Sequence, residues 1–356
     1  MNTTVNPNMI MLARESRGLT QKEVAELLKI TQGYMSKMEN GLSIITEKLL
    51  DDIVRILRYP MRFFFDESQI YPPDVAFYRK YKSLSKKSQE KICALANVTR
   101  LNIEKMLRPV EIDHKSIPNC DLEEYGTPEQ VARALREFWS LPRGPILNLT
   151  KVIEDAAIVV KFHQVETNAF SGMNMPIGRN YYLIFMNARM PWDRIRWTEA
   201  HELGHILMHR LPNPYMEEQA DRFAAEFLMP ADMIRPELSD VCLEKLASLK
   251  PRWRVSIAAL LKRALTLKKI TERQYRYCWM QMGKLGWRLR EPPELEPPAE
   301  PTFILEELIK IHMQDLHYTL DELSKIVGMH EEEFAERYTI RIPQLRLVKK
   351  RYNAIS

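Results

Sequence analysis

The stretch RWTEAHELGHILMHR, residues 196–210, holds three of the eight histidines in the chain. His201 and His205 are four residues apart, so on a helix both imidazoles face the same side about one turn apart. This spacing suits a tetrahedral zinc ion. Glu202 lies beside them, where its carboxylate can take a proton from a metal-bound water and deliver it to a leaving amine. The motif HELGH therefore predicts a metal-dependent hydrolytic site.

A catalytic zinc ion needs a third protein ligand, and the downstream segment EEQADRFAAEFLMP offers one. Glu217 and Asp221 are four residues apart, so Glu217 can bind the metal while Asp221 accepts a hydrogen bond from the far nitrogen of a ligating histidine. Glu218 is the alternative ligand, but it projects about 100° away and has no such partner four residues later. His209 lies ~12 Å along the helix from His201, so we expect a buried role or one behind the ligands.

The elements around these residues are predicted to form a mixed domain. Thr127 and Pro128 open a helix that runs to Trp139, ILNLTKVIEDA predicts another, and AIVVKFHQV and YYLIFMN are typical of short strands. Gly204 is costly inside a helix, and close packing beneath the metal is a reason to tolerate it. A metal-free amphipathic helix with buried histidines is the alternative interpretation. We predict a central α+β domain over residues 117–290.

A separate pattern lies near the N-terminus, in LTQKEVAELLKITQGYMSKMENG, residues 19–41. Thr20 caps one helix with Glu23 as its capping-box partner, and Thr31 caps a second helix after a short turn. In a helix-turn-helix the second helix enters the DNA major groove. The residues nominated for DNA contact are Gln32, Gly33, Ser36 and Lys37, with Gln21 near a phosphate. A bundle used only for protein contacts is the alternative.

Charge and turn geometry qualify this prediction. Residues 10–60 carry eight Lys and Arg against seven Asp and Glu, so non-specific affinity for DNA should be modest. Lys29 stands at the turn position where a left-handed backbone would cost on the order of 1 kcal/mol.

A Pro- and Glu-rich segment, REPPELEPPAEP, predicts a semi-extended linker before a last helical unit. This unit repeats the spacing of the N-terminal motif with Gly328 in the place of Lys29. The matching residues are Leu323, Ser324, Val327, Met329 and Phe334 for Val24, Ala25, Leu28, Ile30 and Met35. Residues 303–340 carry nine acidic and three basic side chains, which repel phosphate, so we interpret the unit as an interaction module. The basic end RIPQLRLVKKRYN could contact nucleic acid or an acidic partner.

Composition excludes other classes of protein. No apolar run approaches the ~20 residues that span a bilayer, and the first residues lack the pattern of a secretory signal, so we expect a cytoplasmic protein with no membrane partner. The cysteines are scattered with no C-x-x-C pair, which favours isolated reduced thiols. They are Cys93, Cys120, Cys242 and Cys278.

Two resemblances extend these interpretations. Residues from about Ile10 to Phe65 resemble the Xre/Cro family of repressor-type DNA-binding domains. The paired motifs WTEAHELGHILMH and EEQADRFAAEFLMP, with LPRGPILNLTKVIEDAAIVV before them and LKPRWRVSIAALLKRALTLKKIT after them, resemble the ImmA/IrrE family of zinc metallopeptidases. The second resemblance implies a gluzincin-like fold, Zn2+ bound by His201, His205 and Glu217, and water activated by Glu202. It also implies limited proteolysis of a repressor-type protein in a phage, mobile-element, stress-response or toxin-antitoxin system.

We therefore predict a multidomain, mainly α protein. Its parts are a helix-turn-helix domain (1–66), a helical connector (67–116), a gluzincin-like α+β metallopeptidase domain with a small sheet (117–290), the linker (291–301) and a C-terminal helical module (302–356). The predicted function is transcriptional regulation through a zinc-dependent endopeptidase that cleaves a helix-turn-helix repressor or the protein itself. We expect double-stranded DNA as a partner, and a homodimer. The alternatives are a DNA-binding regulator whose metal domain is only a sensor or scaffold, and a toxin-antitoxin component.

Overall fold

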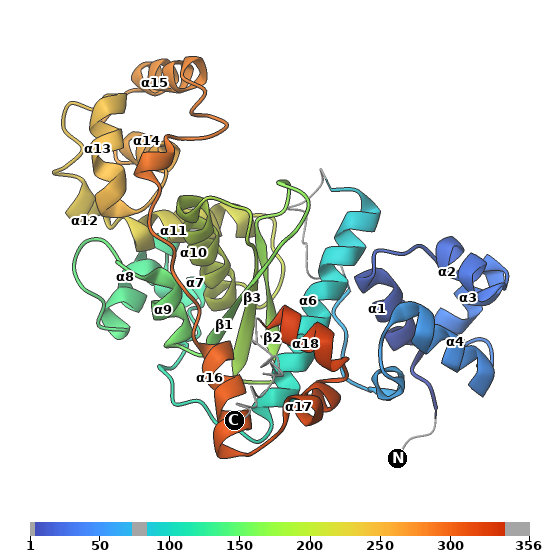
Figure 1. The fold of residues 1–356 in the computed structure, drawn as a ribbon. Helices are drawn as coiled ribbons and strands as arrows, with labels where there is room; N and C mark the ends of the chain where they lie inside the picture. The colour runs from blue at the N-terminus through green and yellow to red at the C-terminus, as the bar shows by residue number, and fades with distance from the viewer. Residues whose placement is uncertain (1–3, 73–83, 339–356) are drawn as a thin grey trace, which may run out of the picture.

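The computed structural model describes residues 4–72 and 84–338. It is mainly helical with one small sheet, and this confirms the predicted fold class (Figure 1). The basic segment RIPQLRLVKKRYN lies outside the described residues. No helix in the described ranges is both long and apolar enough to cross a membrane.

The N-terminal domain is a helix-turn-helix bundle. Its elements are α1 (Pro7–Ser16), α2 (Gln21–Leu28), α3 (Gln32–Glu39), α4 (Glu47–Leu57) and the 3-10 turn η1 (Met61–Phe65). The Thr20–Glu23 capping box is present, and the Thr31 hydroxyl accepts a hydrogen bond from the backbone of Tyr34. Lys29 adopts the left-handed conformation with φ 56°, as its turn position predicted.

Helix α6 (Lys86–Leu107) joins the N-terminal domain to the rest of the protein. Ala94 and Val98 pack into the core of the N-terminal helices, whereas Ile92 and Ile103 pack into a second core with the sheet and the C-terminal helices. One helix thus contributes to two cores, which places the N-terminal helix-turn-helix bundle beside the sheet.

The central domain surrounds a three-stranded sheet. Its helices are α7 (Leu122–Tyr125), α8 (Pro128–Phe138), α9 (Leu149–Glu154), α10 (Trp192–Met208), α11 (Met216–Leu228), α12 (Ala231–Ile234), α13 (Leu243–Trp253), α14 (Ile257–Thr266) and α15 (Glu272–Lys284). The strands are β1 (Ile158–His163), β2 (Gly172–Ile177) and β3 (Tyr181–Asn187), in the order β1-β3-β2. Strand β3 is parallel to β1 and antiparallel to β2.

The sheet separates two hydrophobic cores because side chains alternate along a strand. Val160 and Ile184 face a core that includes α8, α10, α11 and α14, whereas Val159 and Phe185 face the core shared with α6. Strand β2 was not predicted from the sequence, because Pro176 argues against a strand there. In the structure β2 is an edge strand, where a sheet tolerates proline.

The C-terminal module consists of α16 (Ile304–Lys310), the π-helical turn η3 (Ile311–Asp315), α17 (Leu320–Val327) and α18 (Glu331–Arg337). Gly328 ends α17 in the left-handed conformation with φ 81°, the equivalent of Lys29 after α2. Leu323 and Phe334 are buried in the core with α6, and Arg17 donates to both carboxylate oxygens of Glu333 at 2.9 and 2.8 Å. The C-terminal module therefore packs against α6 and contacts the N-terminal domain through Arg17.

Residues 291–301, with the turn η2 (Pro293–Leu295), are fastened to the central domain by glutamates. Glu291 accepts hydrogen bonds from the backbone of Ile257 and Ala258 at the start of α14, at 2.9 and 3.1 Å. Glu300, which is 2 % exposed, accepts from the backbone of Leu149 and Thr150 at 2.6 and 3.0 Å. Carboxylates are stabilised at helix N-termini by the helix dipole. The sequence predicted a semi-extended linker here but none of these contacts.

Glu154 accepts hydrogen bonds from the backbone that follows residues 291–301. The burial of the Glu154 carboxyl group predicts that the stability of the protein depends on pH. This group accepts hydrogen bonds from Phe303 N at 2.6 Å and Val160 N at 3.2 Å, and burial raises its pKa from 4.5 to about 7. Between these values the folded protein holds a proton that the unfolded chain releases, so the free energy of unfolding falls as the pH rises through this window, by up to ~3 kcal/mol.

We expect Glu154→Gln to flatten this part of the pH profile of the melting temperature. The exposed Glu137 gives a matched control, because Glu137→Gln removes the same charge without changing a buried group. If Glu154→Gln retains the full pH dependence of the wild type, another group is its source.

Candidate metal centre

Two adjacent helices bring the predicted ligands together. His201 and His205 lie on α10, and Glu217 lies in the first turn of α11. His201 Nε2 lies 3.0 Å from His205 Nε2 and 3.5 Å from Glu217 Oε2, and His205 Nε2 lies 3.4 Å from Glu217 Oε1. The edge of a zinc tetrahedron with bonds near 2.0–2.1 Å is about 3.3 Å long. The two imidazole nitrogens and the Glu217 carboxylate are therefore spaced as ligands of one such ion.

The hydrogen bonds behind the imidazoles determine which ring nitrogens carry protons. His201 Nδ1 lies 2.8 Å from Asp221 Oδ1, and since an ionised carboxylate only accepts, Nδ1 donates and Nε2 keeps its lone pair. His205 Nδ1 lies 2.9 Å from His209 Nδ1, and His209 Nε2 lies 2.9 Å from the amide oxygen of Gln219.

The same reasoning orients the second imidazole. Burial lowers the pKa of His209 to about 4, so its ring is neutral and carries one proton. The Gln219 oxygen accepts a hydrogen bond from His209 Nε2–H, which leaves His209 Nδ1 unprotonated to accept a hydrogen bond from His205 Nδ1–H. Both His201 and His205 then present unprotonated Nε2 atoms toward Glu217, as a metal site requires.

Glu202 is buried beside the ligands, with 3 % of its surface exposed. Asn174 on strand β2 donates from its side-chain amide to Glu202 Oε2 at 2.7 Å. This bond fixes one carboxylate oxygen, so the direction of the carboxylate is set by the sheet. The role of Asn174 was not predicted from the sequence. Asn174 lies in a strand that was not recognised, and no spacing rule relates it to Glu202, 28 residues later.

Gly204 accounts for the close approach of the two helices. A Cβ atom at this position would lie 3.0 Å from Cδ1 of Phe223 and 3.4 Å from the Cα of Ala220, both on α11. A larger side chain would require the Phe223 ring or the α11 backbone to shift by a few tenths of an ångström, and Glu217 is carried by α11. The glycine thus sets the distance between the elements that carry the ligands.

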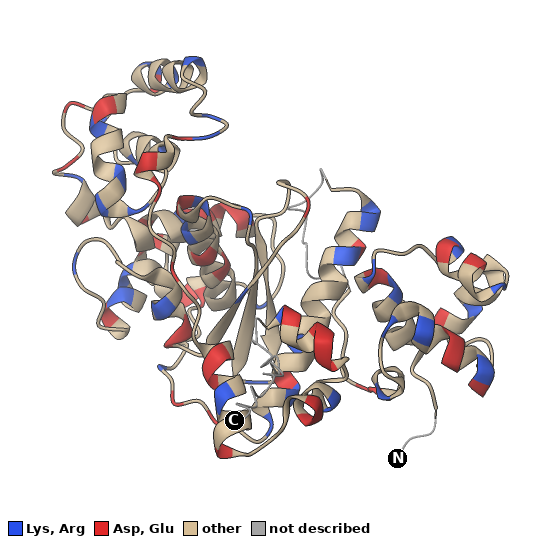
Figure 2. Cartoon of the chain, in the orientation of Figure 1, with Lys and Arg blue, Asp and Glu red and all other residues tan. Residues whose placement is uncertain are grey.

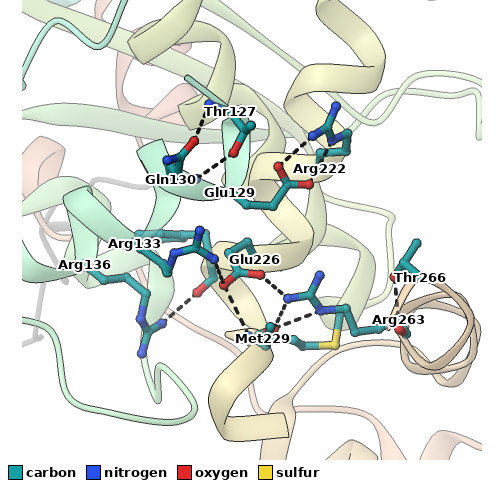
Figure 3. A network of polar contacts seen from close by, with 12 residues as sticks. Thr127, Glu129, Gln130, Arg133, Arg136, Arg222, Glu226, Met229, Arg263 and Thr266 are labelled. Carbon is teal, nitrogen blue, oxygen red and sulfur yellow. Dashed lines mark hydrogen bonds and ion pairs between the residues drawn. The ribbon is translucent and has the colours of Figure 1, made fainter. Parts of the chain in front are cut away.

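Ion pairs in the middle and the last turns of α11 hold the helix in place (Figure 3). Glu226 is 1 % exposed and pairs with Arg133 of α8 at 3.0 Å and with Arg263 of α14. Arg222 pairs with Glu129 at the start of α8 at 2.8 Å. α11 is therefore braced on two sides, while Glu217 and Asp221 remain 38 % and 58 % exposed at the accessible side of the site.

The fit to zinc follows from the donor set. Two neutral imidazole nitrogens and one carboxylate within 4.8 Å of one another are the ligands that catalytic zinc uses, with a position left for water or substrate. Glu218, the alternative ligand, instead lies 4.0 Å from Arg222 with 70 % of its side chain exposed.

The residues nominated for DNA contact lie at a separate site. Gln32, Gly33 and Lys37 are exposed on α3, and Ser36 is half-buried. Among the described residues no atom lies within 4 Å of where a Cβ at Gly33 would stand, so packing there does not require glycine. Gln21 donates one amide proton to Glu39 at 2.7 Å, which leaves a second proton for a phosphate.

Two family models match the chain. Residues 10–64 match the family model described as helix-turn-helix, and residues 153–265 match the peptidase-family model described as the IrrE N-terminal-like domain. The second match includes the HELGH motif and Glu217. No curated protein matched the chain in the search. The chain thus carries an Xre-type helix-turn-helix domain followed by an IrrE/ImmA-like domain of a peptidase family.

Proposed function

We propose that this protein is a DNA-binding transcriptional regulator whose IrrE/ImmA-like domain is a zinc-dependent endopeptidase. The observation that carries the proposal is that the donor atoms of His201, His205 and Glu217 lie 3.0–3.5 Å apart. Glu202 lies beside the two histidines on α10. A structural zinc site would need four protein ligands and no adjacent carboxylate base. Three ligands with a buried glutamate beside them favour catalysis.

Each residue has a defined part in the proposed reaction. Zinc bound here would polarise the scissile carbonyl and lower the pKa of a water molecule. Glu202 would accept a proton from the attacking water and pass it to the leaving amine, and Asn174, which donates to Glu202 Oε2, would hold the carboxylate in place for both transfers. Asp221 and His209 orient the two imidazoles from behind.

The proposed targets follow from the fused domain. Helix α3 would place Gln32, Gly33, Ser36 and Lys37 at the major groove of double-stranded DNA, with Gln21 near a phosphate. We propose a repressor of the helix-turn-helix type, or the protein's own N-terminal domain, as the peptide substrate. A homodimer would match two half-sites of an operator. Cleavage would then change transcription in a stress, mobile-element, phage-defence or toxin-antitoxin circuit.

Zinc content per chain tests the ligand set. In metal-replete protein we expect about one zinc per wild-type chain and near-complete loss in His201→Ala and Glu217→Ala, since two remaining ligands bind zinc weakly. Glu218→Ala is the matched control, because it removes the neighbouring carboxylate from the same turn and should retain zinc. Elemental analysis of folded protein measures all four. Folded wild type without zinc would overturn the proposal.

A further inference from the structure

The charge of the chain is concentrated in one segment that neither proposed site uses. Residues 251–290 contain eleven Lys and Arg and a single acidic residue, Glu272, which gives a net charge of +10. The whole chain has a net charge of +5, so the remainder carries −5. Solvated helix faces usually mix both signs, and a net charge this uneven indicates a polyanionic partner.

This segment forms helices α14 and α15 at the end of the molecule away from the helix-turn-helix domain (Figure 1). On α15 the buried residues Cys278 and Met282 face inward. At 100° per residue, Arg273, Arg276 and Lys284 fall within one narrow stripe on the opposite face. All three are exposed, and Figure 2 shows basic residues along α15 and the loop after it.

Two more exposed cations, Lys268 and Lys269, lie in the turn just before α15. We call these five residues the α15 cationic stripe: Lys268, Lys269, Arg273, Arg276 and Lys284. Within the described ranges none of the five forms an ion pair, whereas the nearby Arg252 pairs with Glu237 at 3.3 Å. Their charges are therefore available to a partner.

Aromatic side chains of α15 attach the helix to α14 and to the loop that follows α15. The rings of Tyr275 and Trp279 are stacked with centroids 6.2 Å apart. Lys262 Nζ lies 5.9 Å from the Tyr275 ring centroid, and the Arg288 guanidinium lies 5.1 Å from that of Trp279. Such cation–π contacts fix the helix against α14 and the following loop. The stripe is thus presented on an ordered surface.

We propose that the α15 cationic stripe binds the phosphate backbone of duplex DNA without reading its sequence. The helix is 13 residues long, about 20 Å, and duplex DNA carries one negative charge per ~1.7 Å of its axis. The helix-turn-helix region, residues 10–60, has a net charge of only +1, so it supplies little of the electrostatic attraction that DNA-binding proteins use. The α15 cationic stripe would supply this electrostatic attraction from the other end of the molecule.

The mode of contact differs from that of a recognition helix. The first backbone amides of α14 already bind the carboxylate of Glu291, at 2.9 and 3.1 Å, so this helix end does not receive a phosphate. Contact is instead made by side chains along the length of α15. Such contacts position a protein on DNA but carry no sequence information. This inference does not depend on peptidase activity.

Salt dependence of DNA binding by the full chain tests the inference. The variant Arg273→Gln/Arg276→Gln/Lys284→Gln removes three exposed charges and should lower the slope of log affinity against log salt by about 2.7, so that between about 50 and 200 mM salt the wild type loses ~40-fold more affinity than the variant. Fluorescence anisotropy with a labelled duplex of arbitrary sequence measures this. The control Lys151→Gln/Lys310→Gln/Lys325→Gln removes three exposed lysines elsewhere and should keep the wild-type slope.

Three further measurements distinguish DNA binding by the α15 cationic stripe from a structural effect and from binding of an acidic protein. Arg273→Lys/Arg276→Lys/Lys284→Arg preserves charge and should retain the wild-type slope, whereas a loss equal to that of the glutamine variant would indicate a structural effect and overturn the proposal. Binding to poly-L-glutamate tests an acidic protein partner. If the glutamine variant loses affinity for this polymer but not for duplex DNA, the stripe is a protein-docking surface and the DNA assignment is wrong. Lys37→Ala, in the helix-turn-helix domain, should lower the slope by only about 1.

Discussion

Glu202→Gln should lower peptide hydrolysis by about 10²–10⁴-fold while leaving bound zinc unchanged. The amide keeps the shape of the side chain and can still meet Asn174, but it cannot accept a proton from water. The ligands on α10 and α11 do not include Glu202, so the metal should stay in place. Digestion of a mixed peptide library by zinc-loaded protein, read by mass spectrometry, measures the loss, and elemental analysis measures the zinc.

The matched control uses a carboxylate on the same domain that lies away from the ligands. Glu137→Gln, on the exposed side of α8, should cleave like the wild type. Equal cleavage by Glu202→Gln and wild type would remove Glu202 from the reaction. Zinc-loaded wild type that cleaves no peptide, including its own chain and a helix-turn-helix repressor, would leave the metal domain as a sensor or scaffold.

Glu300→Ala should destabilise the central domain by about 3–5 kcal/mol, because it leaves a buried charge without its partner. Glu300 pairs with Arg196, a residue of α10 that is fully buried. The same carboxylate accepts the first backbone amides of α9. Its removal therefore also leaves two buried donors unsatisfied. Chemical denaturation monitored by circular dichroism measures the change.

The neighbouring Glu294 is exposed in the same segment, so Glu294→Ala should change the free energy of unfolding by less than about 0.5 kcal/mol. A second comparison isolates the buried charge. Arg196→Met/Glu300→Leu removes both charges and should recover part of the stability that Glu300→Ala loses. If Glu300→Ala is as stable as Glu294→Ala, the pairing of Glu300 with Arg196 does not stabilise the central domain.

Sequence periodicity predicted the local geometry of both sites. Because an α-helix repeats every 3.6 residues, the spacing of His201 and His205 placed both imidazoles on one face before any fold was known. Capping residues predicted the starts of α2 and α3, because a cap also acts over only three residues of the chain. The left-handed turn at Lys29 was recognised because its neighbours in the chain define it.

Contacts between distant segments could not be predicted in this way. Asn174 reaches Glu202 only because β2 lies at the edge of the sheet next to α10, and Glu300 reaches Arg196 across 104 residues. The distance of His209 from His201 along the chain argued against His209 as a third ligand. The orientation of the His209 ring, however, depends on a hydrogen bond to Gln219 of α11. None of these partners has a spacing rule, because each depends on how helices and strands pack.

The sequence by itself therefore determined which residues are grouped along each helix: the two histidines with Glu202 on α10, Glu217 with Asp221 on α11, and the candidate DNA contacts on α3. Only the tertiary structure decided how these groups meet. The close approach at Gly204 brings α11 to α10, and five of the eleven basic side chains of residues 251–290 lie exposed on α15 and in the turn before it. The physical reason is that helical periodicity acts over a few residues, whereas the burial of apolar surface that joins the helices is not directional and depends on the whole fold.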